Sequence, residues 1–255
     1  MKIAYTINGL IGGLSGKNFQ LKDQEIAPLI IKYTGNTVNK FIKANNDVDF
    51  FIFSWQPELK EHFDSVYNPK LSTYMNQDTF NVPSYIPNDI RTQAHYSRWF
   101  GVKILSEMIR DSNTNYDLIV NCRMDTCWNN DIHFNKFDQD RIHVAYHKTH
   151  PHYLPSNKDG NIMCDHIFIA NSENFHTIAT LFDSLNEYAH PKVHRCSYSH
   201  ISNHFLLPQH MKATKLVDKL QGSVVNILDD GNGKGDYDIF RYRNVTKNQL
   251  ELYEL

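Results

Sequence analysis

Short apolar runs alternate with amphipathic segments along the first half of the chain. Three runs have the length and apolar content of buried strands, namely 2–8 ("KIAYTIN"), 47–55 ("DVDFFIFSW") and 116–128 ("YDLIVNCRMDTCW"). Helices are expected at 36–46 and 92–111, where apolar residues recur at helical spacing. Three prolines interrupt residues 58–90, so a short helix, a short strand and an exposed loop are expected there. This order predicts a mainly parallel sheet with right-handed crossovers.

The second half of the chain has a different pattern. The expected elements are strands at 141–146 and 164–172, a helix at 173–188, a helical segment at 201–211 and an edge strand at 223–228. Ser172 is the expected N-cap of the first of these helices. The polar segment 147–161 has the length of loops that often carry function. Together the two halves predict an α/β domain, a mixed and mainly parallel sheet flanked by helices.

Length and composition limit the class of protein. A chain of 255 residues can bury one substantial core, and 41% apolar with 21% charged residues is typical of a globular protein. The formal net charge of -2 argues against the broad basic surface of a nucleic-acid binder. No run approaches the 18 or more apolar residues of a membrane span, and the opening "MKIAYTING" lacks the apolar core of a secretory signal. We therefore expect a cytoplasmic protein with no transmembrane segment.

Cysteines and histidines give little support for a metal or redox site. The four cysteines are scattered, so they are expected to be small buried or half-buried thiols: Cys122, Cys127, Cys164 and Cys196. Two histidine-rich segments, 147–152 and 190–210, lack the spacing of a zinc site. The first is expected to be a solvated loop. Each histidine of the second is expected at the surface or the edge of the core, although one of them could supply a ligand to a divalent metal held elsewhere. A zinc-dependent hydrolase is a distant hypothesis.

A glycine-rich turn follows the first strand but does not form a phosphate-binding P-loop. Gly16 and Lys17 would require glycine at position 11, where Ile11 stands, and Asn18 follows the lysine in place of Ser or Thr. A plain loop is the simpler interpretation, although a flexible turn beside a ligand site stays open.

The strand at 116–128 ends in a way that points to chemistry. Arg123 and Asp125 follow the apolar run Leu118–Val120. Burying an unpaired charge costs on the order of several kcal/mol. These side chains should therefore emerge where the strand leaves the sheet, or meet partners there. In open α/β sheets, ligands bind at that edge.

Taken in order, the elements resemble the GT-A class of nucleotide-sugar glycosyltransferases. The segment 116–125 resembles a "YD-apolar-apolar-RxRxD" strand of some bacterial and viral members, and 47–55 is similar to their "(D)VFIxxW" strand. The opening strand and the helix before the acidic strand also match in order, and the likeness extends to about residue 210. The resemblance implies a single GT-A-like, Rossmann-related domain, with 1–127 as the nucleotide-binding half and 128–255 as the acceptor-side half.

The resemblance also implies a charged site for the leaving diphosphate. A DxD-type motif holds a divalent metal, Mn²⁺ or Mg²⁺, in such enzymes, and Asp125 occupies its second acidic position. The first position is Arg123. Either Asp125 binds the metal with diphosphate and water, or Arg123 replaces part of the metal's charge. A third interpretation is a structural ion pair between Arg123 and Asp125 or Asp117.

Further site residues follow from the same resemblance. The residues expected near the nucleotide or its pocket are Asn8, Gly9, Ser54, Trp55, Ser97 and Arg98. Asp165 is a candidate for contacting the acceptor or acting as the base. The family often has a Glu where this chain has "HISNHFLL", and neutral His204 could accept a proton there.

Two functions are therefore open. The first is transfer of a sugar from a nucleoside-diphosphate sugar to a glycan or other hydroxyl acceptor. The second is a non-catalytic nucleotide- or sugar-binding module on the same fold, because a fold does not settle function.

Overall fold

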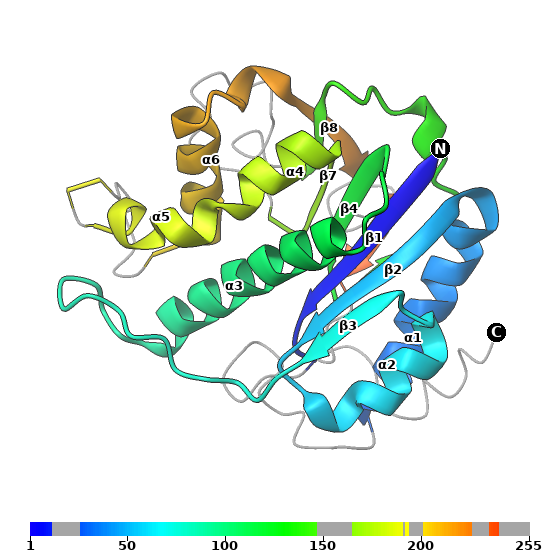
Figure 1. Ribbon diagram of the computed structural model, residues 1–255, viewed down its shortest axis with the longest axis horizontal. Helices are drawn as coiled ribbons and strands as arrows, with labels where there is room; N and C mark the ends of the chain where they lie inside the picture. Colours follow the sequence, from blue (N-terminus) through cyan, green and yellow to red (C-terminus); the bar gives the residue numbers. More distant parts are fainter. Residues whose placement is uncertain (12–25, 147–164, 191, 194–200, 226–234, 240–255) are drawn as a thin grey trace.

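A seven-stranded sheet in the order β3-β2-β1-β4-β7-β6-β8 forms the centre of the molecule (Figure 1). The computed structural model describes residues 1–11, 26–146, 165–190, 192–193, 201–225 and 235–239. The strands of this sheet are β1 (Lys2–Gly9), β2 (Asp47–Ser54), β3 (Leu71–Tyr74), β4 (Leu118–Arg123), β6 (Ile142–Tyr146), β7 (Ile167–Ala170) and β8 (Leu220–Val225).

Strand direction determines which residues meet at each edge of the sheet. Strands β1 to β4 run parallel to one another, and β6 runs parallel to β8, whereas β7 is antiparallel to both of its neighbours. The start of β7 therefore lies at the edge where β1 and β4 end. The chain leaves β1 for β2 on one side and later enters β4 on the other, so the strand order reverses between β1 and β4.

Helices cover both faces of the sheet. The α-helices are α1 (Ile26–Phe41), α2 (Lys60–Tyr67), α3 (Ile90–Asp111), α4 (Ser172–Ala179), α5 (Leu181–Tyr188) and α6 (Asn203–Ala213). Short 3-10 turns lie at Lys43–Asn45, Pro57–Leu59, Phe134–Lys136 and Val217–Lys219. Helices α1 and α2 pack on one face, and α3 to α6 lie over the other (Figure 1).

The alternation of side chains along the central strands creates two cores. On β1, Ile3, Tyr5 and Ile7 face α1 and α2, whereas Ala4 faces α3. Because successive side chains of a strand point to opposite faces, a strand buried on both faces is mainly apolar along its whole length. This explains the continuous apolar runs in the sequence.

The polypeptide turns out of the main sheet directly after β4. Met124 and Asp125 form a turn, and β5 (Thr126–Trp128) then pairs antiparallel with β9 (Tyr237–Ile239) in a separate two-stranded sheet. The buried Nε1 of Trp128 donates a 2.7 Å hydrogen bond to the hydroxyl of Tyr5, which anchors this small sheet to β1.

The α/β class and the mostly parallel, helix-flanked sheet of one domain are confirmed, but several element boundaries were wrong. The strand expected at 116–128 is two strands in different sheets. The helix expected at 36–46 begins at Ile26 and ends at Phe41. The helix expected at 173–188 breaks at Thr180 into α4 and α5. Asn171, not Ser172, is its N-cap, since the Asn171 side chain accepts from the Asn174 amide at 2.9 Å.

Other expectations have mixed outcomes. Segment 201–211 is largely helical, and β8 is an edge strand that begins at Leu220. Cys122 and Cys127 are buried thiols outside any disulfide, as expected. Most of the glycine-rich turn, all of 147–161, Cys164 and Cys196 lie outside the described residues. Within the described part of the chain, none of the helices has the length and hydropathy to cross a membrane.

One glycine in α1 is required by close helix packing. A Cβ at Gly35 would lie 2.0 Å from Cγ1 of Val66 in α2. Glycine inside a helix costs about 1 kcal/mol relative to alanine, so its presence here reflects the contact with α2.

We expect Gly35→Ala to lower the free energy of unfolding by about 1–3 kcal/mol, because overpacking outweighs the better helix propensity. Urea denaturation measures the change. Adding Val66→Ala removes the colliding methyl group and should restore most of the loss, with Val66→Ala alone completing the cycle. A more stable Gly35→Ala protein would contradict this account.

Candidate functional site

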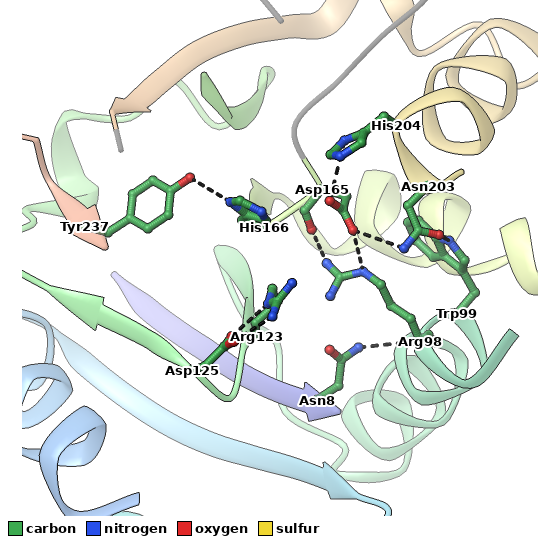
Figure 2. A network of polar contacts seen from close by, with 10 residues as sticks. All are labelled: Asn8, Arg98, Trp99, Arg123, Asp125, Asp165, His166, Asn203, His204 and Tyr237. Atoms are coloured by element: carbon green, nitrogen blue, oxygen red, sulfur yellow. Dashed lines mark hydrogen bonds and ion pairs between the residues drawn. The ribbon is translucent and has the colours of Figure 1, made fainter. Parts of the chain in front are cut away.

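The carboxyl ends of β1 and β4 carry the charged cluster of the molecule that the sequence pointed to. Asn8 near the end of β1 is the register partner of Arg123 at the end of β4. The strand order reverses between these two strands, and ligands of open α/β sheets bind at such a point. Figure 2 shows the residues that converge here.

Arg123 and Asp125 form a two-pronged ion pair across the turn between β4 and β5. Nε of Arg123 lies 2.7 Å from Oδ1 of Asp125, and Nη2 lies 2.5 Å from Oδ2. Paired N–H groups that meet both carboxylate oxygens are the strong geometry for such contacts. The structural ion pair considered from the sequence is thus present, between Arg123 and Asp125.

Asp165 reaches the same edge because β7 runs in the opposite direction. Cys122 of β4 is the register partner of Ile167, so the residues just before β7 lie beside the end of β4. Oδ2 of Asp165 forms a 3.2 Å ion pair with Nε of Arg98 from α3, and Oδ1 lies 3.7 Å from Nδ1 of His204. Arg98 Nη2 also donates to the Asp165 carbonyl.

A chain of hydrogen bonds fixes the Asp165 carboxylate between two helices. Trp99 Nε1 donates to Asn203 Oδ1 at 2.9 Å, and Asn203 Nδ2 donates to Asp165 Oδ2 at 3.1 Å (Figure 2). Asn8 Nδ2 contacts the carbonyl of Arg98 at 3.4 Å. These contacts join β1, α3, α6 and the start of β7 into one network.

Opposing effects determine the protonation of Asp165. Burial by itself raises the pKa of Asp165, but the charge of Arg98 first, and then those of His204, His166 and Arg123, outweigh it. The pKa of Asp165 is therefore held well below its ordinary range. A carboxylate with so low a pKa is a poor general base, because its affinity for the proton that it would have to abstract is low.

His166 is neutral beneath the charged groups. Burial is the main cause that lowers the pKa of His166, to about 3, and the charge of Arg123 adds to this while Asp165 opposes it. Its Nδ1 lies 3.4 Å from the hydroxyl of Tyr237 in β9. His166 thus links the charged edge to the small sheet.

Several buried polar atoms at this side of the fold have no hydrogen-bond partner among the described residues. They are Oδ1 of Asn8, Nε1 of Trp55 and Oγ of Ser97. Such atoms normally find partners, and an unsatisfied one costs about 1–3 kcal/mol. Trp55 is held by aromatic contacts, with ring centroids 4.9 Å from Phe53 and 5.5 Å from Phe100.

Gly9 and Ser54 were also predicted to lie near the nucleotide. In the described part of the chain their contacts hold the ends of β1 and β2 in place. The carbonyl of Gly9 accepts from the Trp55 amide at 3.2 Å, which ties the ends of β1 and β2 together. Gly9 has φ +123, a conformation that favours glycine. The buried Oγ of Ser54 accepts from the Gln56 amide at 3.1 Å.

The acidic groups at this edge do not fit a divalent metal as they are arranged. Both oxygens of Asp125 accept from the Arg123 guanidinium, and Oδ2 of Asp165 faces Arg98 and Asn203. Mg²⁺ and Mn²⁺ require oxygen ligands turned toward the ion. No group of three or more His, Cys, Asp or Glu in the described ranges is placed to hold a metal ion.

Some residues of the cluster were not predicted. Asn203, Trp99, His166 and Tyr237 complete the network, yet no motif marks them. Only the position of His166 beside Asp165 was a signal, and it becomes informative once the direction of β7 is known. The histidines at 147–152 lie outside the described residues.

The chain matches no protein-family model and no curated protein sequence. The fold and the geometry of this edge are therefore the basis for assigning a function.

Acid should destabilise the protein through His166. Its folded pKa of about 3 lies below the ordinary histidine value of about 6.5, so the unfolded chain binds the proton first. This part of the stability is fully present above about pH 6.5 and falls by about 1.4 kcal/mol per pH unit toward pH 3. Urea denaturation at about pH 7.5, 6.5 and 5.5 measures the slope.

His166→Asn should reduce this slope by up to about 1.4 kcal/mol per pH unit, the contribution of one proton. A stability difference between wild type and His166→Asn that is independent of pH across this window would refute the assignment. The low pKa of Asp165 adds a further loss only below about pH 4.

Proposed function

We propose that the protein is a GT-A-like glycosyltransferase that moves a sugar from a nucleoside-diphosphate sugar to a hydroxyl acceptor. The observation that carries the proposal is the convergence at one point of the sheet of Arg123, Arg98 and His204 with the unsatisfied Oδ1 of Asn8. The strand order reverses at this point, where nucleotide ligands bind in open α/β sheets.

The two kinds of group suit the two parts of such a donor. Guanidinium groups recognise phosphate oxygens through charged, paired hydrogen bonds, which supports Arg123 as a diphosphate contact. Buried atoms that lack partners, such as Oδ1 of Asn8 and Nε1 of Trp55, gain hydrogen bonds when a nucleoside supplies them. The acceptor side is assigned to α6 and the start of β7.

Transfer requires the acceptor hydroxyl to lose a proton as its oxygen bonds to the anomeric carbon. The bond from that carbon to the diphosphate breaks, and the diphosphate leaves with the electron pair. His204 is assigned as the proton acceptor, because it is partly exposed and lies 3.7 Å from Asp165. Asp165 positions this imidazole, because its own carboxylate is held ionised by Arg98.

A second candidate is a non-catalytic nucleotide- or sugar-binding module. It is favoured by the fact that both carboxylates of the network face cations, which leaves neither of them available as a base. A binding module would bind the nucleotide but release none from a sugar nucleotide. Hydrolysis or transfer assayed with a panel of donors therefore separates the two functions.

Nucleoside diphosphates should raise the melting temperature of the protein, because a ligand bound only by the folded state adds to its stability. UDP, GDP, ADP and CDP are compared, with and without Mn²⁺. No shift with any of them would count heavily against the proposal.

A matched pair of serines in α3 tests where the nucleotide lies. Ser97→Ala should weaken binding by about tenfold, the value of one buried hydrogen bond, while stability stays level or rises, because the hydroxyl has no described partner. Ser106→Ala should lower stability by about 1–2 kcal/mol without affecting binding, since Ser106 Oγ contacts His176 Nδ1 at 2.7 Å. Calorimetric titration and urea denaturation measure the two effects, and equal binding by both variants would remove Ser97 from the site.

His204→Gln should lower kcat for transfer or donor hydrolysis by about 100-fold or more, with the nucleotide Kd within about threefold of wild type. The reason is that the variant loses the proton acceptor but no diphosphate contact. His133→Gln is the matched control and should retain full activity. Unchanged kcat in His204→Gln would exclude the assigned role.

A further inference from the structure

In two of the ion pairs at this edge the basic side chain is the more exposed member. The side chain of Arg123 is 37% exposed and that of Asp125 is 11% exposed. Likewise His204 is 35% exposed, whereas its acidic neighbour Asp165 is 9% exposed. A ligand that approaches the described surface therefore meets the basic member of each pair, and the carboxylates lie beneath.

The turn that carries the Arg123–Asp125 pair is held firmly. The two residues are separated only by Met124, which is 3% exposed and belongs to the core under α1 and α2. β4 anchors the turn on one side and β5 on the other. The guanidinium is thus oriented before any ligand binds, and a preorganised donor loses little conformational entropy on binding.

A metal ion at Asp125 would have to displace or oppose the guanidinium. Both carboxylate oxygens already accept from Arg123, at 2.7 and 2.5 Å, and a dication on the same carboxylate would be repelled by that neighbouring charge. The more exposed member of this pair, Arg123, already carries a positive charge. Arginine can supply to a phosphate what a metal supplies, namely positive charge and directed contacts to oxygen.

We infer that the diphosphate of the donor is held directly by Arg123, without a divalent metal, and that Asp125 is a positioning residue for this arginine. The inference rests on the proposed function and identifies how that site recognises its substrate. Asp125 fixes the plane of the guanidinium from below. The phosphate oxygens accept hydrogen bonds on the exposed side, and Arg123 counters the negative charge that grows as the diphosphate leaves.

Titration calorimetry with UDP and with inorganic pyrophosphate tests the inference on the full chain. Binding of UDP should be the same, within about twofold, in excess EDTA and with added Mn²⁺, and pyrophosphate should bind in EDTA. Arg123→Gln should weaken both ligands by about tenfold or more, and Arg123→Lys by a smaller factor, since lysine keeps the charge but loses the planar fork.

Asp125→Asn separates the two roles of the carboxylate. A positioning residue replaced by the isosteric amide should leave metal-free UDP binding within about fivefold of wild type, because the arginine charge remains. A metal ligand replaced in this way would lose all Mn²⁺-dependent binding. Lys103→Gln, which removes an exposed cation paired with Asp183, is the surface control and should bind as wild type.

The results distinguish failure of the inference from failure of the proposed function. UDP binding that requires Mn²⁺ and disappears in Asp125→Asn would overturn the inference while supporting a transferase. Pyrophosphate binding without metal, with no binding of any nucleoside diphosphate, would support the anion site and overturn the transferase. Melting temperatures of all variants, measured first, confirm that each is folded, and the Arg123→Lys result stands if Arg123→Gln fails to fold.

Discussion

The buried contact between Arg98 and Asp165 is the constraint on which the arrangement of the site depends. It joins the third turn of the long helix α3 to the residues just before β7, and it is surrounded by Asn8, Asn203 and the ring of Trp99. A buried pair of this kind adds little net stability, but loss of one partner leaves an uncompensated charge that costs about 3–5 kcal/mol. The pair therefore selects one arrangement of α3, α6 and β7, and the position of His204 follows from it.

The architecture could be read from hydrophobic patterning where the elements are buried on both faces. β1, β2 and β4 are mainly apolar because each is covered by helices on two sides, and their order in the chain predicts parallel pairing. The break after β4 could not be read in this way, because Met124 and Cys127 are as buried in the turn and in β5 as they would be in one long strand. Likewise the spacing of apolar residues continues from α4 into α5, so it does not reveal that the helix is interrupted at Thr180.

The sequence predicted several residues of the site, but it did not predict most of the contacts between them. Residues at the ends of expected parallel strands meet because strand direction requires it, which is why Asn8 and Arg123 lie side by side. Asp165 joins them for a reason that local sequence does not contain, since the direction of β7 is set by its neighbours β4 and β6. The close pairing of Arg123 with Asp125 depends on the turn between two sheets, so the sequence left both metal binding and ion pairing open.

The link from Trp99 through Asn203 to Asp165 has a consequence for biosynthesis. Its members are separated by 104 and 38 positions, so the network closes only after α6 has been made and has packed against α3. Domains are synthesised from the N-terminus at about 5–20 residues per second, and contacts distant in sequence form late because loop closure must precede them. The nascent chain thus exposes the first strands and α3 well before this edge of the sheet is complete, and a closed network reports that the C-terminal elements have folded.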